Sequence, residues 1–128
     1  MSMIHDIKTY LVAEGITDTI YTGLMADSPD DAIALYQYAG QGPLHMAGVK
    51  RPGLQVRTRS KTYTTALDLI EAIAAILNQV GDEINGTAEG ETISGTRYLI
   101  IRSTQSAFQL GEDDHGRTEF AQNFYVTI

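Results

Sequence analysis

The stretch that decides the fold is Leu54-Gln55-Val56-Arg57-Thr58-Arg59-Ser60. Apolar and polar side chains alternate along it, which is the period of a strand with one buried face. We therefore expect Leu54, Val56 and Thr58 to face the core. The side chains expected to face outward are those of Gln55, Arg57 and Arg59. Two arginines on an exposed sheet face form a site for carboxylates, and a solvated strand face is the alternative interpretation.

A long amphipathic helix is predicted directly after this strand, from Thr62 to about Val80. Asp68 and Glu71 lie in its early turns, where the helix dipole favours negative charge. Its apolar residues form one stripe at helical spacing, namely Ala66, Leu67, Ile70, Ile73, Ala74 and Leu77. The stripe indicates a helix that packs on the core, not a cofactor site.

Upstream of this unit, the sequence predicts a short helix and two strands. Ser2 can cap the helix and Gly15 can end it. The apolar residues at helical spacing between them are Ile4, Ile7 and Leu11. The first strand is expected from Ile16 to Thr22 and the second from Ala32 to Tyr38, with turn-forming residues between the two.

Downstream of the long helix, residues 81–95 are polar and glycine-rich, with short strands expected near Ile84 and Ile93. The apolar run from Thr96 to Thr104 predicts a central strand that is covered on both faces. Residues 111–117 read as a polar turn. The last predicted strand runs from Thr118 to Ile128, and one of its faces carries Phe120, Phe124, Val126 and Ile128.

This order of elements predicts an α+β fold, with an antiparallel or mixed sheet of about four to five strands and two helices packed on one side. The chain has 128 residues, of which 43% are hydrophobic and 20% are charged, so we expect one domain over residues 1–128. It contains no cysteine, which excludes disulfides and thiolate chemistry. We expect a soluble, intracellular protein, because no secretory signal and no membrane-spanning run is visible.

The charges are distributed unevenly along the chain. The net charge is −7, yet residues 32–67 contain no acidic residue and five of the nine basic ones. The basic residues of this band are Lys50, Arg51, Arg57, Arg59 and Lys61. The remaining four basic and 16 acidic residues carry −12. Two complementary surfaces suit head-to-tail contact between copies or docking on a charged partner, whereas the net charge argues against general nucleic-acid binding.

The segment from Gly40 to Gly53 is rich in glycine and proline, so regular structure is not expected in it. It also carries Leu44, Met46 and Val49, which a purely solvated loop does not need. We expect this loop to become ordered against a partner, for example a neighbouring copy.

Residues for catalysis or metal binding do not cluster in the sequence. His5, His45 and His115 lie in separate segments and lack the spacing of a metal motif. Asp113-Asp114-His115 beside Arg117 is better read as an exposed turn than as an acid–base set. We therefore expect no cofactor, no metal and no enzyme activity.

Several motifs in order resemble a family of phage minor capsid proteins that is similar in size and layout to tail terminators. Its front half looks like Ile20-Tyr21-Thr22-Gly23-Leu24-Met25, then Asp27-Ser28-Pro29-Asp30. Its middle looks like Pro52-Gly53-Leu54-Gln55-Val56-Arg57-Thr58-Arg59-Ser60, then Tyr63 and the long helix. Its end looks like Leu110-Gly111-Glu112-Asp113-Asp114-His115-Gly116-Arg117, followed by Asn123-Phe124 and the closing strand.

The resemblance implies a structural virion protein that forms a ring, commonly of six copies, on the head-proximal end of the tail tube. Such a protein stops tube growth and meets the head connector, and it brings no catalytic residues. Its partners would be the tube protein and the connector or stopper protein, and DNA would pass through the lumen without specific binding. It would be made in the bacterial cytoplasm and would bind no membrane. A head-completion or connector-stopper protein is the first alternative, and a small acidic enzyme or ligand-binding domain is the second.

In such a ring, one patch of each copy meets a different patch of the next. We hypothesise that Lys50, Arg51, Arg57 and Arg59 meet carboxylates of a neighbour or of the last ring of the tube. The candidate carboxylates are those of Glu112, Asp113 and Asp114. Leu44 and Met46 in the glycine-rich loop are candidate apolar contacts, and excess acid elsewhere would line the lumen and repel DNA.

Overall fold

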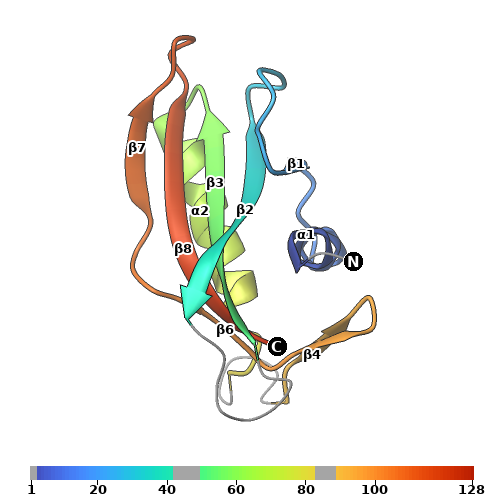
Figure 1. Cartoon of the computed structure of the whole chain (residues 1–128). Coiled ribbons are helices and arrows are strands. Elements are labelled where there is room, and N and C mark those ends of the chain that lie inside the picture. The colour runs from blue at the N-terminus through green and yellow to red at the C-terminus, as the bar shows by residue number, and fades with distance from the viewer. Residues whose placement is uncertain (1–2, 42–49, 83–88) are drawn as a thin grey trace.

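A computed structural model describes residues 3–41, 50–82 and 89–128 of the chain. Two helices and one large sheet make up most of it, and a small hairpin projects from one end (Figure 1). In chain order the elements are α1 (Met3–Ala13), β1 (Thr19–Thr22), β2 (Ala32–Gln41), β3 (Arg51–Ser60), α2 (Tyr63–Leu77), β4 (Glu91–Ile93), β5 (Thr96–Tyr98), β6 (Ile100–Ser103), β7 (Phe108–Glu112) and β8 (Thr118–Thr127). None of the helices in this described part is long and apolar enough to cross a membrane.

The main sheet is mixed and has six strands. Its order is β1-β2-β3-β8-β6, and β7 pairs with β8 on the same side as β6 but further along the strand. β1 runs parallel to β2, and every other pair is antiparallel. β4 and β5 form a separate two-stranded hairpin. The α+β prediction with a mixed sheet is confirmed.

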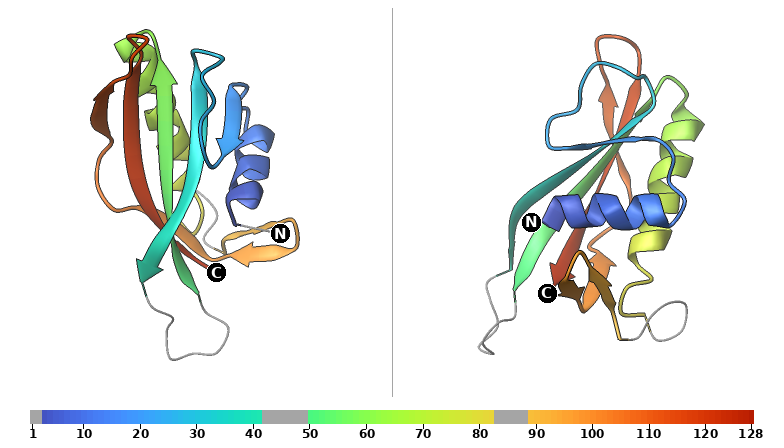
Figure 2. Two further views of the ribbon diagram at one scale, coloured as in Figure 1. Left: turned by 45° about the horizontal axis from the view of Figure 1, so that its top comes forward. Right: turned by 90° about the vertical axis from the view of Figure 1, so that its right-hand side faces the viewer.

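Both helices lie on one face of the sheet, as Figure 2 shows. On β3 the predicted alternation holds on this face, because Leu54, Val56 and Thr58 are all fully buried. The ten-residue β8 lies beside β3 and buries Phe120, Phe124 and Val126 on the same face. The helices contribute the other half of this core through Met3, Ile7, Tyr10 and Leu11 of α1 and Ala66, Ile70, Ile73 and Leu77 of α2.

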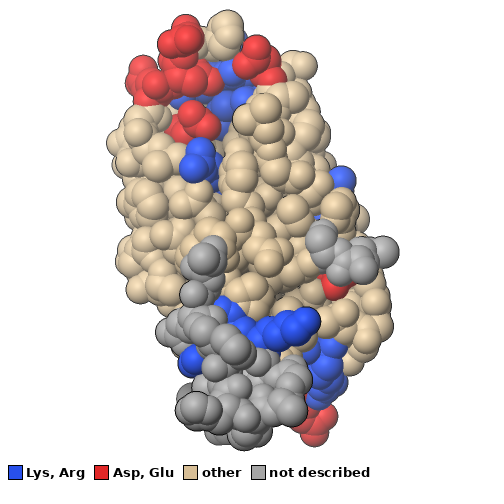
Figure 3. All heavy atoms as spheres, viewed as in Figure 1, with Lys and Arg blue, Asp and Glu red and all other residues tan. Residues whose placement is uncertain are grey.

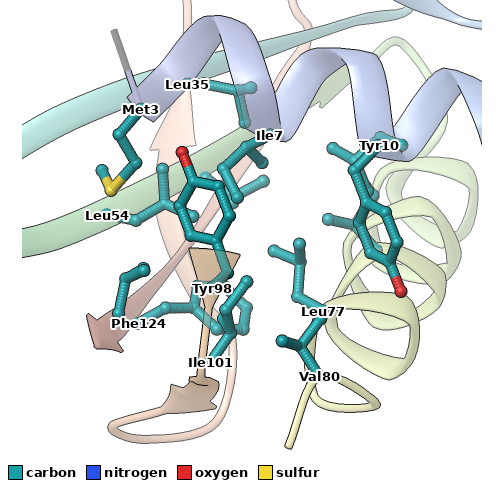
Figure 4. Close-up of a cluster of buried hydrophobic side chains, with 14 of the residues drawn as sticks. Met3, Ile7, Tyr10, Leu35, Leu54, Leu77, Val80, Tyr98, Ile101 and Phe124 are labelled. Atoms are coloured by element: carbon teal, nitrogen blue, oxygen red, sulfur yellow. The ribbon is translucent and has the colours of Figure 1, made fainter. Parts of the chain in front are cut away.

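Tyr98 lies in the middle of this core, with its hydroxyl pointing toward α1 (Figure 4). The hydroxyl donates a hydrogen bond of 2.5 Å to Asp6 Oδ2. Asp6 is only 1% exposed, although it lies in the first turn of α1, where the helix dipole stabilises a carboxylate. The β4–β5 hairpin is thereby joined to the start of the chain.

The predicted central strand from Thr96 to Thr104 is wrong. The segment forms two short strands, β5 and β6, which are separated at Leu99, and β6 lies at the edge of the sheet. Its apolar residues serve different contacts: Tyr98 reaches α1, Ile101 enters the main core, and Leu99 is 42% exposed. The apolar run from Thr96 to Thr104 is therefore not one strand buried on both faces. The central strands of the sheet are β3 and β8.

The prediction of irregular structure from Gly40 to Gly53 is also wrong at both ends, because β2 extends to Gln41 and β3 begins at Arg51. Gly53 permits this extension. It pairs with Tyr38, and a Cβ atom at position 53 would lie 2.4 Å from Tyr38 Cε2. The missing side chain therefore leaves the space in which the tyrosine ring lies across the neighbouring strand.

The end of α2 is fastened to the edge of β6. Ile101 N–H donates to the carbonyl of Val80 at 3.2 Å. The Arg102 guanidinium donates to the carbonyls of Asn78, Val80 and Gly81 at 3.0–3.1 Å. Asn78 is the C-cap residue of α2, and Val80 and Gly81 lie in the turn that follows it, so this arginine from a distant strand holds the turn that ends the helix.

Candidate assembly surfaces

Charged side chains gather at the two ends of the sheet, and the surface between them is mostly uncharged (Figure 3). The acidic end holds the β1–β2 connection and the tip of the β7–β8 hairpin (Figure 1). Its acidic residues are Asp27, Asp30, Asp31, Glu112, Asp113 and Asp114. The opposite end holds Lys50 and Arg51 at the start of β3. A ten-residue strand spans about 30 Å, so the two ends are far apart on the molecule.

Arg117 binds acidic residues from both segments of the acidic end. Its side chain is only 2% exposed, and Nε donates to Asp113 Oδ2 at 2.7 Å. The guanidinium also donates to the carbonyl oxygen of Asp27, and it lies 3.4 Å from the carboxylate of Asp30. One buried cation therefore ties the β7–β8 hairpin to the β1–β2 connection.

The Asp113 carboxylate accepts hydrogen bonds from N–H groups of its own turn. Its Oδ1 accepts the N–H groups of His115 at 3.0 Å and Arg117 at 2.9 Å. Desolvation by itself raises the pKa of this carboxyl, but these two N–H groups and the Arg117 guanidinium outweigh it and hold the pKa below its usual value. The predicted turn is present after Glu112, where β7 ends, but the expectation that it is exposed is wrong for Arg117, which is buried. Glu112 and Asp114 are exposed.

The prediction that Arg59 faces solvent is wrong, because only 4% of its surface is exposed. Arg59 Nη2 donates to the carbonyl of Pro29 at 2.5 Å, and Nε donates to that of Asp30 at 3.2 Å. Lys61 lies 3.5 Å from the carboxylate of Asp30. The alternation placed Arg59 correctly on the face opposite the core, but the β1–β2 connection folds over that face and covers it. Arg59 and Lys61 of the basic band are therefore bound to the β1–β2 connection within the chain.

Arg57 occupies the middle of this outer face and is only partly buried. Its Nε donates to Gln55 Oε1 at 2.8 Å, and its Cζ lies 4.8 Å from the centre of the Tyr36 ring. Gln55 in turn donates to Asn123 Oδ1 at 2.9 Å. The stacked ring and the amide hold the guanidinium in place, while its two terminal nitrogens have no acceptor among the described residues.

Beside Arg57 the outer face has a shallow hollow of about 160 Å³, lined by Tyr36, Tyr38, Gln55 and Asn123. The Tyr38 hydroxyl donates to the carbonyl of Phe124 at 3.3 Å. Tyrosine and arginine are enriched in protein–protein interfaces, because each combines a large contact area with polar groups. The outer face therefore has the composition of a contact surface.

A second hollow of about 310 Å³ lies on the helix side, between α2 and the segment that leads into β7. It is lined by Leu67, Glu71, Ala74, Ser106, Ala107 and Gln122. Within residues 3–41, 50–82 and 89–128, no three His, Asp or Glu side chains lie close enough together to hold a metal ion.

The residues singled out from the sequence do not form one site. Glu112, Asp113 and Asp114 lie at one end, Lys50 and Arg51 lie at the other, and Arg57 lies between them. Leu44 and Met46 fall outside the described residues. The sequence analysis missed Asp27 and Asp30 as partners of Arg117. The available signal was the acidic turn at residues 27–31 and a single arginine, Arg117, that follows three acidic residues.

Two comparisons relate this structure to known proteins. The sequence model of a family described as bacteriophage tail terminator protein matches residues 10–128. A solved structure described as the virion of a native gene transfer agent particle contains a chain with a similar fold, at a TM-score of 0.72 and 10% sequence identity. The match covers 98% of this chain and 93% of that one. The search of curated proteins gave no match.

Proposed function

The chain belongs to the bacteriophage tail terminator family, and from this premise we propose that it closes into a ring on the head-proximal end of the tail tube. There it stops tube growth and joins the tail to the head connector. As a member of this family, the chain is a structural protein of phage tails and a component of the virion. The observation that carries the proposal is the family match over nearly the whole chain.

Ring contacts are heterologous, so each copy must present two different and complementary patches. Arg57 supplies one of them, because its free terminal nitrogens form a fork for a carboxylate. Glu112 and Asp114 at the hairpin tip supply the other, because they are exposed while Asp113 is held by Arg117. The carboxylate that meets Arg57 belongs to a neighbouring copy or to the last ring of the tube.

Substitutions of Arg57 and Arg59, both on β3, test the proposed contact of Arg57 with a carboxylate. Arg57→Glu is expected to leave the thermal unfolding midpoint nearly unchanged and to reduce the number of capped tails, because Arg57 holds no distant part of the fold. Arg59→Glu is expected to lower the midpoint, because Arg59 is buried against the carbonyls of Pro29 and Asp30. Normal tail length and capping with Arg57→Glu would remove this residue from the interface.

Lys50 and Arg51, at the opposite end of the sheet, are proposed to meet an acidic partner surface of the tube or the connector. The Lys50 backbone exchanges two hydrogen bonds with Ile128, at 2.9 and 3.1 Å, which fixes where this basic end begins. Leu44 and Met46 remain proposed apolar contacts. A Lys50→Glu/Arg51→Glu variant that caps tubes as well as the wild type would contradict this assignment.

Purified protein added to growing tail tubes tests the function itself. A terminator fixes tube length and is seen by electron microscopy at one tube end. A head-completion or connector-stopper protein, the alternative, leaves tube length unchanged and binds the head side. We further propose that acidic side chains line the lumen, so that DNA passes without specific binding; an image of the ring with these acids on its outer wall would overturn this last point.

A further inference from the structure

The outer edge of β7 is an open end of the sheet. β7 pairs with β8 on its inner side, and within the described ranges no strand or helix pairs with its other side. All of its residues except Gly111 are exposed, including the apolar Phe108 at 37% and Leu110 at 44%. A strand edge offers unpaired N–H and C=O groups that another strand can bind, and apolar side chains beside it favour that pairing.

The neighbouring β6, on the same side of β8, is not open in this way. Its Ile101 N–H is bonded to the carbonyl of Val80, and Arg102 binds the carbonyls at the end of α2. The fold therefore closes one half of this edge with its own helix end and leaves the half formed by β7 open.

At the opposite end of the sheet, α1 packs against β1, and Thr22 Oγ1 lies 3.5 Å from His5 Nε2. β1 is the terminal strand there, and no described strand pairs with its outer side. Leu24, two residues after β1 ends, is 90% exposed, the most exposed large apolar side chain in the described part of the chain. The two ends of one sheet thus carry edges of similar length, five residues in β7 and four in β1, with exposed apolar side chains beside each.

The strand directions make these two edges compatible. β1 is parallel to β2, and each step from β2 through β3 and β8 to β7 reverses direction, so β7 runs opposite to β1. A rotation about an axis along the strands keeps these directions in every copy. In a ring built that way, β7 of one copy meets β1 of the next in antiparallel orientation, the more stable type of pairing.

We propose that β7 of each copy pairs with β1 of the next copy, and that Phe108 and Leu110 pack against the partner around its Leu24. This inference rests on the ring of the proposed function and names the surfaces that close it. Repetition around the ring joins the sheets of all copies and leaves no open edge.

The absence of cysteine from the sequence permits a clean cross-linking test. Cysteine pairs are introduced in one chain, with Phe108→Cys, Gln109→Cys or Leu110→Cys on β7 combined with Thr19→Cys or Leu24→Cys beside β1. The variants are assembled into tails in the host cell, oxidised, and analysed on a non-reducing denaturing gel. At least one pair is expected to give a ladder from dimers up to the full ring, while each single variant stays monomeric. Leu24→Cys with Leu99→Cys, which places the second thiol on an exposed residue away from β7, is the matched control and is expected to give no ladder.

Three results would overturn the inference. Dimers formed by a β7 single variant alone would show that β7 pairs with itself. Rings seen by electron microscopy without a ladder from any pair would refute the contact and leave the proposed function intact. Tails that carry no ring of this protein would refute both.

A charge placed on the edge gives an independent readout. Leu110→Lys is expected to keep the wild-type unfolding midpoint and to reduce the fraction of capped tails by about tenfold or more, since lysine on an edge strand opposes pairing. Val12→Lys on the exposed side of α1, where the side chain is 54% exposed, is the control and is expected to cap normally. Normal capping with Leu110→Lys would count against the proposed pairing.

Discussion

Tyr98 donates a hydrogen bond of 2.5 Å to Asp6 across 92 positions of sequence, and both side chains are buried in the core. Asp6 Oδ1 has no hydrogen-bond partner among the described residues. A buried carboxylate with a single strong donor depends heavily on that donor, because burial without a hydrogen bond costs free energy. The Tyr98 hydroxyl is therefore the polar link between α1 and the β4–β5 hairpin, beside the apolar contacts that Tyr98 and Ile93 make in the same core.

We predict that Tyr98→Phe lowers the free energy of unfolding by about 2–3 kcal/mol, because it leaves the Asp6 carboxylate buried without a donor. Urea denaturation measures this. Tyr63→Phe, at a tyrosine that is 49% exposed, is the control and is expected to change the value by less than about 0.5 kcal/mol. Adding Asp6→Leu to Tyr98→Phe is expected to recover part of the loss. Equal stability of Tyr98→Phe and the wild type would contradict the prediction.

Alkaline pH is predicted to destabilise the fold through its buried tyrosines. Burial, then the charges of Glu14 and Glu91, raises the pKa of Tyr10 to about 12, and burial followed by the bond to Asp6 raises the pKa of Tyr98 as well. In the unfolded chain a tyrosine ionises near pH 10, so the folded state retains these protons longer. The resulting stability is fully present below about pH 10 and is lost as pH rises through the folded values.

Unfolding midpoints measured from pH 8 to 12 check this. Tyr10→Phe is expected to flatten the decline above pH 10, whereas Tyr63→Phe is expected to leave the slope unchanged. Identical slopes for the wild type and Tyr10→Phe would show that Tyr10 does not contribute.

At the acidic end, Asp113 is predicted to stabilise the fold only where it is ionised. Its pKa is lowered in the folded state, so its contribution is present above the unfolded value of about 4 and is lost as pH falls through the folded value. Asp113→Asn is expected to lower the thermal midpoint at pH 7, and this difference from the wild type is expected to shrink below pH 4. Asp114→Asn, in the same turn but exposed, serves as the control, and an effect equal to that of Asp113→Asn would refute the prediction.

Arg102 is predicted to stabilise the end of α2. Arg102→Ala removes the donors that bind the carbonyls of Asn78, Val80 and Gly81, and it is expected to cost about 1.5–3 kcal/mol. Hydrogen exchange is expected to accelerate from residue 76 to residue 82 before it does elsewhere in α2. Arg97→Ala in the exposed β4–β5 hairpin is expected to have a smaller effect on stability and none on this segment. Unchanged protection after Arg102→Ala would mean that these hydrogen bonds are dispensable.

The sequence predicted the parts of the fold that depend on local periodicity. The alternation along β3, the stripe of α2 and the apolar face of β8 all face the predicted core, because each pattern matches the repeat of its element. The break at Leu99 and the strand β7 were not predicted. β5 forms a hairpin with β4, β6 pairs with the end of β8, and β7 forms a hairpin with the start of β8. Periodicity carries no information about pairing partners.

The candidate interface was predictable only in part. Composition located the basic band, and alternation placed Arg57 and Arg59 on the face opposite the core. It did not show that the β1–β2 connection folds over Arg59, because that contact joins residues 30 positions apart. The partners of Arg117 were missed for the same reason, since Asp27 lies 90 positions away.

The position of β8 in the sheet has a consequence for synthesis in the cell. β8 pairs with β3, β6 and β7, yet it is the last of these strands to leave the ribosome. A nascent chain that stops before residue 118 leaves all three of those strands without their common neighbour, so truncated products are not expected to enter a growing particle. Completion of the sheet must also follow translation of this segment, and long-range pairing such as that of β3 with β8 is slow compared with helix formation. Only a chain that has been translated through β8 can therefore complete the sheet and assemble.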